Sequence, residues 1–181
     1  MKFVANKMLT SKTAEFKNID ECESSPLATA LFEIPSVKEI FIDENYISVT
    51  KFDRFEWMEI GNDIRSFIRE FIANGGIVLD ETKWVETPKQ EQQEIKNFEN
   101  LDVTSQQIIN ILEEYVKPAV QADGGNILFE SFNVEEKKVK VILQGACNGC
   151  PSSTFTLKNG IENMLKQMLH NEQIMVEAIN G

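Results

Sequence analysis

The stretch VKVILQGACNGCPSSTFTLKNGIENMLKQML, residues Val139 to Leu169, changes its hydrophobic pattern at a pair of cysteines. Before the cysteines, closely spaced branched apolar residues predict a β-strand over Val139 to Gln144. After them, apolar residues recur at three- and four-residue steps and predict a helix from about Ser152 to His170. The sequence therefore predicts a strand that runs through a short glycine-rich loop directly into a helix.

The residues on either side of this stretch predict the rest of an α+β domain. An apolar stripe predicts a first helix, for which Thr104 and Gln107 form a capping box. Pro118 should kink or tighten this helix near Lys117. The turn residues ADGGN end that helix; strands follow over residues 127–133 and, near the chain's end, in IMVEAI. The resulting order is helix–strand–strand–helix–strand. The crossover through the second helix makes the last two strands parallel if they are neighbours.

Another small α+β domain is predicted over residues 1–88. The segment SSPLATALFEI predicts a short helix capped by Ser25, and VKEIFIDENYISVTKF predicts a β-hairpin. A helix with one apolar face follows from Trp57 and stops at two glycines. Glu, Gln, Lys and Asn dominate residues 89–103, so we expect a polar linker there and the C-terminal domain over residues 104–181.

The composition limits the classes of partner. The formal net charge is −11 at pH 7 and no run of lysines and arginines interrupts it, so the chain should repel the phosphates of nucleic acids and anionic membranes. We therefore expect no nucleic-acid and no membrane partner, and no apolar run reaches the length of a membrane span. The first residues, MKFVANKMLT, resemble neither a secretory signal nor a transit peptide. They predict a cytoplasmic location, or an organelle matrix only if a presequence has been removed.

Cys147 and Cys150 form the candidate site. Only two residues separate them, so a tight turn can bring both sulfurs to one metal ion or cluster. Gly145 and Gly149 leave room for backbone N–H groups to point at bound sulfurs. The helix that begins after Pro151 turns its positive end toward the loop, which favours thiolates and an anionic cluster.

Two structural alternatives compete with a cluster. The two cysteines can be small apolar core residues, or they can bind zinc, which takes four ligands. The rest of the chain offers one histidine and one cysteine. His170 lies about 30 Å beyond Cys150 if the helix is continuous. Cys22 stands between two glutamates that disfavour its thiolate, so we expect a loop thiol without a role. Two chains across a two-fold axis would supply four thiolates, the number that an iron–sulfur cluster takes.

A thiol–disulfide oxidoreductase is the second functional hypothesis, because thioredoxin-type enzymes also place C-x-x-C at the start of a helix. No Trp precedes the pair here, and the predicted strand–strand–helix order lacks the βαβ entry of that fold. Other enzyme signatures, such as a Ser/His/Asp set or a phosphate-binding loop, do not stand out in the sequence. We expect a protein that is not an enzyme, in which Asp123 ends a helix and does not act as an acid.

Several motifs resemble one known family. The segment ILEEYVKPAVQADGGNILFESF, the loop GACNGCPSS and the helix TLKNGIE are similar to the C-terminal domain of the NifU-like, or Nfu, family of iron–sulfur proteins, over roughly residues 104–179. Residues 1–88 resemble the N-terminal domain of the same family through PLATALFEI and VKEIFIDENYISVTK.

The resemblance implies a function. It implies a homodimer that shares one 4Fe–4S cluster between paired C-x-x-C loops, with Cys147 and Cys150 as the ligands from each chain. It also implies that the cluster is assembled or carried for apo iron–sulfur proteins, with cluster-assembly proteins as further partners. The N-terminal domain has no matching cysteine loop, and the resemblance implies a partner-contacting or targeting role for it.

Overall fold

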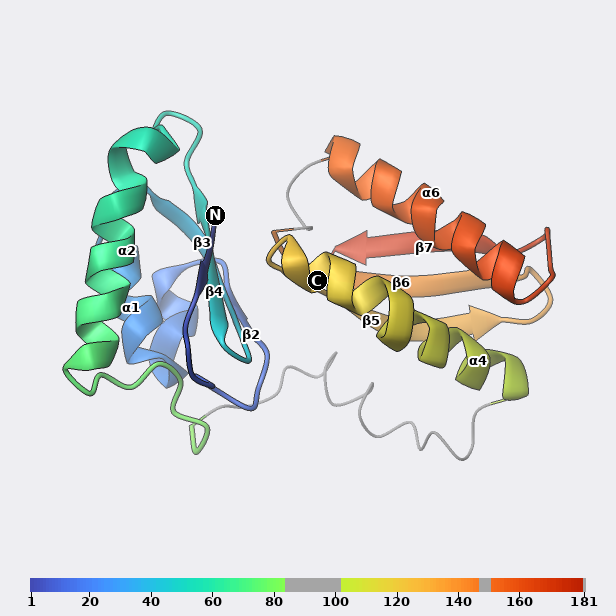
Figure 1. The fold of residues 1–181 in the computed structure, drawn as a ribbon, viewed down its shortest axis with the longest axis horizontal. Helices are drawn as coiled ribbons and strands as arrows, with labels where there is room; N and C mark the ends of the chain where they lie inside the picture. Colours follow the sequence, from blue (N-terminus) through green and yellow to red (C-terminus); the bar gives the residue numbers. More distant parts are fainter. Residues whose placement is uncertain (84–101, 147–150, 181) are drawn as a thin grey trace. The chain divides into compact units, whose positions relative to one another are not determined.

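The computed structural model describes residues 1–83, 102–146 and 151–180. The chain divides into two compact units, Met1–Val85 and Glu86–Gly181. Each unit has helices and a sheet of its own (Figure 1), which confirms the predicted α+β class. The predicted domain limits stay a prediction, and the linker proposed over residues 89–103 lies almost wholly outside the described residues.

The first unit contains a four-stranded antiparallel sheet. Its order is β1-β4-β3-β2, and the strands are β1 (Lys2–Val4), β2 (Ala14–Phe16), β3 (Val37–Asp43) and β4 (Tyr46–Lys51). The predicted hairpin is confirmed as β3 and β4, because Asp43 pairs with Tyr46 across a two-residue turn. Glu44 adopts a left-handed φ of 43° in this turn. Positive φ is what the favoured two-residue hairpin turns require.

Three helical segments accompany this sheet: the 3-10 helix η1 (Ile19–Ser24), α1 (Pro26–Phe32) and α2 (Trp57–Ala73). Ser25 caps α1 as predicted, because its hydroxyl accepts a hydrogen bond from the Ala28 N–H at 3.0 Å. Figure 1 shows α1 and α2 on the same side of the sheet. Apolar side chains from both helices and from the facing side of the sheet form one core, among them Leu27, Leu31, Ile40, Ile42, Ile47, Ile64 and Ile68.

The predicted stop of α2 is confirmed. Gly75 has a φ of 80°, a conformation that favours glycine because it has no Cβ. The N–H of Gly76 donates to the carbonyl of Phe71 at 2.9 Å, and the N–H of Gly75 donates to that of Ile72 at 3.2 Å. These bonds satisfy the last carbonyls of the helix and turn the chain back toward α1.

The second unit has a three-stranded sheet in the order β5-β6-β7. Strands β5 (Gly125–Asn133) and β6 (Lys138–Gly145) are antiparallel, and β7 (Met175–Asn180) pairs with β6 in parallel. Helix α6 (Pro151–Met168) makes the crossover between β6 and β7. The predicted parallel pair is thus confirmed. Helix α6 supplies the long crossover that two parallel neighbours require.

The first helix of this unit is distorted before Pro118, as predicted, but the turn there is widened and not tightened. The helix consists of α4 (Val103–Ile111), a π-helical turn η3 (Leu112–Val116) and α5 (Lys117–Ala122). Pro118 at the start of α5 has no N–H, and its ring excludes the carbonyl four residues earlier, so regular α-helical bonding cannot continue through it. The predicted capping box is wrong. The cap is Asp102, whose carboxylate accepts the Ser105 N–H at 3.0 Å.

The helices of the second unit lie on one face of its sheet. The core combines Ile108, Leu112, Val116 and Val120 with Val139, Val141 and Leu143 of β6, Ile161 and Leu165 of α6, and Val176 of β7. Alternate residues of β6 point toward this core, as expected for a strand with one covered face. Met168, the last residue of α6, is 42% exposed and lies outside this core.

Candidate metal centre

The predicted ligands Cys147 and Cys150 lie outside the described residues, as do the two residues between them. The structure describes both ends of their loop. Strand β6 ends at Gly145, Ala146 follows, and α6 begins at Pro151. The predicted placement of the pair between a strand and a helix therefore agrees with the elements on either side.

A glycine turn lies against the base of this loop. Gly124 follows α5, and its carbonyl accepts a hydrogen bond from the N–H of Ala146 at 3.3 Å. Gly125 begins β5 and pairs with Gly145, the last residue of β6. Gly124 and Gly145 have φ values of 87° and 66°. Both are left-handed conformations that a side chain would strain, so the approach of the two chain segments depends on glycine.

Sequence reasoning assigned Gly124 and Gly125 to a chain reversal and did not connect them to the cysteines. The structure confirms the reversal, since Asp123 is the C-terminal cap of α5 and the Gly124 N–H donates to the Gln121 carbonyl at 2.9 Å. It adds that the turn holds the residue directly before Cys147. The contact depends on the register of β5 and β6, which pairs Gly125 with Gly145.

Two buried amide side chains stand beside the glycines. Asn126 and Gln144 are directly opposite each other in β5 and β6 and are 2% and 5% exposed. The Asn126 Nδ2 donates to the Gln144 Oε1 at 3.4 Å, and the Ile127 N–H donates to the Asn126 Oδ1 at 2.9 Å. Because both side chains are neutral, they fill this end of the sheet without adding a charge next to the loop.

Helix α6 is anchored to the sheet by Glu162. One oxygen of its carboxylate accepts a hydrogen bond from Lys166 Nζ at 2.8 Å, and the other accepts one from the backbone of β7. The hydrogen bond from Lys166, followed by that from the β7 backbone, lowers the pKa of Glu162 below its usual value of 4.5. These contacts fix the direction of α6, and with it the helix N-terminus that follows the cysteine loop.

Cys22 is a core residue in a 3-10 helix, and its predicted place in a loop is wrong. It lies in η1, is 1% exposed, and its Sγ donates to the carbonyl of Asn18 at 3.4 Å. Burial, with a smaller contribution from Glu21, raises the pKa of this thiol to about 12. Metals bind thiolates, so Cys22 is poorly suited to be a ligand, and its lack of a role stays a prediction.

The remaining possible ligands do not gather elsewhere. His170 is exposed and lies beyond the last residue of α6, with a left-handed φ of 50°. Within residues 1–83, 102–146 and 151–180, no three His, Cys, Asp or Glu side chains are placed to hold one metal ion. No helix in the same residues is long and apolar enough to cross a membrane.

Comparison with known proteins gives two family matches in chain order. The family described as "Scaffold protein Nfu/NifU N terminal" matches residues 1–75, and the "NifU-like domain" family matches residues 108–177. Both matches fall on the two α+β units, and the second spans the glycine turn and the cysteine loop.

Similar proteins are found in plants and animals. NifU-like protein 5, mitochondrial, of Arabidopsis thaliana is 37% identical over 93% of this chain and 60% of its own length. The NFU1 iron-sulfur cluster scaffold homolog, mitochondrial, of Homo sapiens is 36% identical over 92% of this chain and 62% of its own length. The protein of the same name from Drosophila sechellia is 36% identical over 92% and 57%. The chain thus spans about six tenths of the length of these relatives.

The fold and the loop define a protein of two α+β units, the second carrying a C-x-x-C sequence between a strand and a helix. The chain belongs to the Nfu/NifU family, which confirms the resemblance found in the sequence. The expected cytoplasmic location is overturned by these relatives, which are named mitochondrial. The first residues can report only on a signal that they themselves contain, so their composition was a weak basis for a location.

Proposed function

We propose that this protein is an iron–sulfur cluster scaffold or carrier. In this proposal two chains hold one 4Fe–4S cluster between them through Cys147 and Cys150, and deliver it to apo iron–sulfur proteins. Family membership supports the general role, since related proteins carry the name iron-sulfur cluster scaffold homolog. The cluster is the cargo of the protein, received from assembly proteins and passed on, and no catalytic step is part of the proposal.

The observation that carries the ligand assignment is the burial of Cys22. The sequence contains three cysteines, and the one that the structure describes is 1% exposed with its pKa raised to about 12. Each chain is thereby left with two thiols for a cluster that takes four. Two chains related by a two-fold axis complete the set.

The residues around the loop suit the handling of a cluster. The glycine turn at Gly124 and the amide pair of Asn126 and Gln144 give the loop a neutral base. The N-terminus of α6 supplies partial positive charge on the other side, which favours thiolates and the anionic cluster. Transfer requires only that thiolates of the acceptor replace Cys147 and Cys150 at iron, so electrons and charge balance without an added reductant.

Anaerobic reconstitution of the full chain with ferrous iron and sulfide tests the proposal. Absorbance spectroscopy identifies the cluster type, and chemical analysis gives iron and sulfide per chain. About two irons and two sulfides per chain are expected, because one 4Fe–4S cluster is shared by two chains. A stable cluster with four irons per monomer would overturn the shared site, and zinc retained in preference to iron would overturn the cluster.

A further inference from the structure

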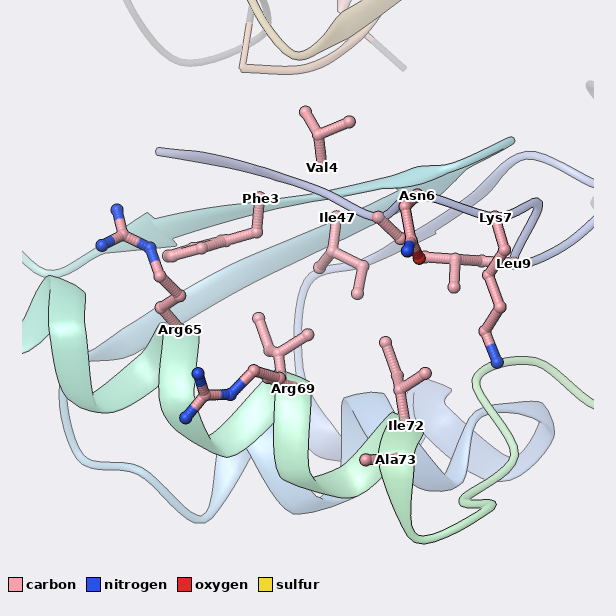
Figure 2. A pocket seen from close by; sticks show the side chains of 12 residues that line it. Phe3, Val4, Asn6, Lys7, Leu9, Ile47, Arg65, Arg69, Ile72 and Ala73 are labelled. Carbon is pink, nitrogen blue, oxygen red and sulfur yellow. The ribbon is translucent and has the colours of Figure 1, made fainter.

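The first unit contains a pocket of about 650 Å³ between the edge of its sheet and α2. Phe3 and Ile47 line it from the sheet, and Ile68 and Ile72 line it from the helix. Figure 2 shows the side chains of Phe3, Ile47 and Ile72 pointing into the space between the sheet and α2. The pocket is therefore an apolar groove that runs beside β1.

Cations stand at both ends of this groove. Arg65 and Arg69 extend from α2 at one end, and Lys7 extends over the other (Figure 2). The chain has three arginines in all and a net charge of −11, so two of its three arginines meet at one apolar groove. The sequence has no run of basic residues that would predict this positively charged groove, because only the fold brings Lys7 close to α2.

The two arginines are not neutralised within α2. The positions three and four residues away from Arg65 and Arg69 hold no carboxylate, although such spacing is where helical ion pairs form. The Arg65 guanidinium donates to the Asn62 amide oxygen at 3.0 Å. Among the residues that the structure describes, no carboxylate forms an ion pair with Arg65, Arg69 or Lys7. A planar guanidinium binds a carboxylate through two parallel hydrogen bonds.

The backbone of β1 is open on the same side. Strand β1 is at the edge of the sheet. Met1 exchanges both hydrogen bonds with Val49, and the Ala5 N–H donates to the Asn45 carbonyl at 2.7 Å. In an antiparallel pair these bonds alternate along the strand. Val4 pairs with Tyr46 at a position of β1 that is not hydrogen-bonded to β4. Its N–H and C=O therefore point away from β4 toward the open edge of the sheet.

We propose that this groove binds an extended acidic segment of a partner protein, which adds to β1 as a fifth strand of the sheet. Main-chain bonds to Val4 hold the segment, alternate apolar side chains enter the groove, and flanking carboxylates bind Arg65 and Arg69. Strand addition of this kind takes its affinity from the backbone and its specificity from the side-chain pockets. The proposal goes beyond cluster binding and does not depend on it.

Charge favours this occupant over a second copy of the chain. Pairing of two copies through β1 would bring Lys7, Arg65 and Arg69 of one copy toward the same cations of the other, since a two-fold interface repeats each surface patch. An acidic segment instead neutralises them. Because the carboxylates would be partly withdrawn from water, their bonds to arginine gain strength.

The test uses the full-length protein without a cluster and a short fluorescent peptide in which valine and threonine alternate between terminal pairs of glutamates. A matched peptide has glutamine in place of each glutamate. Fluorescence anisotropy gives the two affinities, and NMR gives the hydrogen-exchange rate of the Val4 amide. We expect the glutamate peptide to bind about tenfold or more tightly than the glutamine peptide, and to slow exchange at Val4.

Variants separate the groove from general charge effects. The double variant Arg65→Gln/Arg69→Gln should lose the preference for glutamate, whereas Arg54→Gln, which removes the third arginine outside the groove, should keep it. Val4→Pro removes the N–H that points outward from β1, and proline is tolerated at such an edge-strand position. This variant should bind both peptides more weakly.

Three results would overturn the proposal. The first is equal affinity for the two peptides, the second is unchanged exchange at Val4, and the third is an equal effect of Arg54→Gln. Sedimentation without peptide measures whether the protein associates with itself. If it does, and if Val4→Pro abolishes that association, the groove belongs to a second copy of the chain instead. Cluster loading of the same variants should match that of the unaltered chain, so a failure of the groove and a failure of the scaffold function are distinguishable.

Discussion

The carboxylate of Glu162 in α6 accepts a hydrogen bond from the backbone N–H of Val176 in β7, with Oε2 and N 2.9 Å apart. Glu162 lies inside the crossover helix and Val176 near the start of the strand that follows it, so one side chain joins the helix to that strand. The other oxygen of the same carboxylate pairs with Lys166 one helical turn later. The position of α6 against the sheet therefore depends on an ionised glutamate.

Glu162→Gln should destabilise the second unit by about 1 kcal/mol at neutral pH, because the charge-assisted bond to Lys166 is lost while an acceptor for Val176 remains. The pKa of Glu162 is lowered in the folded protein, so its stabilisation is full above the unfolded value of 4.5 and is lost as pH falls through the folded value. The difference between variant and unaltered chain should thus vanish in acid. Urea unfolding followed by NMR signals of this unit measures it.

Glu172→Gln is the matched control, because Glu172 is exposed and near the same strand. It should change stability by less than about 0.5 kcal/mol. An equal effect of the two substitutions, or an effect of Glu162→Gln that persists in acid, would contradict the role assigned to the carboxylate.

Serine in place of Cys147 or Cys150 should abolish cluster binding, because the serine hydroxyl does not replace a cysteine thiolate as a ligand of iron. Cys22→Ala should leave cluster binding intact, since this thiol is buried and its pKa is raised to about 12. Iron and sulfide analysis after reconstitution measures the outcome for each variant. A cluster retained by either serine variant would contradict the assignment of Cys147 and Cys150 as the ligands from each chain.

Loss of the cluster should shift the protein from dimer to monomer, because the iron–sulfur bonds themselves join the two chains and couple binding to association. Sedimentation of the full chain before and after anaerobic chelation measures the change. The Cys147→Ser variant, treated in the same way, should sediment as the chelated protein does. A dimer that survives chelation unchanged would show that other surfaces hold the chains together.

Alanine in place of Gly124 should destabilise the second unit by about 1–2 kcal/mol, because its φ of 87° places a Cβ in a strained conformation. Gly160→Ala should change the stability of the second unit in the opposite direction. Gly160 lies inside α6, and a Cβ there meets no atom within 4 Å, so alanine should stabilise the helix by about 0.5–1 kcal/mol. Thermal unfolding of both variants checks the pair, and equal signs would contradict the backbone argument.

Much of the second unit follows from local sequence, because its elements are long and its hydrophobic periods are clear. The strand and helix around the cysteines and the distortion at Pro118 were predicted correctly. The cap of α4 was not, because Asp102 and Thr104 are both good caps and only the observed bond of Asp102 to Ser105 distinguishes them.

The features that the sequence did not predict depend on contacts between distant residues. Strand β2 has three residues and acquires its pairing only from β3, and such short strands have little periodicity. The sequence predicts a loop around Cys22, yet the 3-10 helix η1 turns the thiol into the core. Likewise, tertiary structure places Lys7 and Arg65 at the two ends of one groove, although each residue is ordinary in its own segment.

The π-helical turn at Leu112–Val116 has a consequence for the residues that follow it. The buried positions Ile108, Leu112, Val116 and Val120 are spaced by four residues, and in an α-helix four residues rotate by about 400°, so the stripe would drift around the axis by about 40° at each step. The wider turn takes up this drift and sets the rotational phase of α5. If these five residues were bonded as a regular α-helix, Val120 would lie about 120° from Ile108 around the axis, off the sheet, and the Gly124 carbonyl would move away from Ala146.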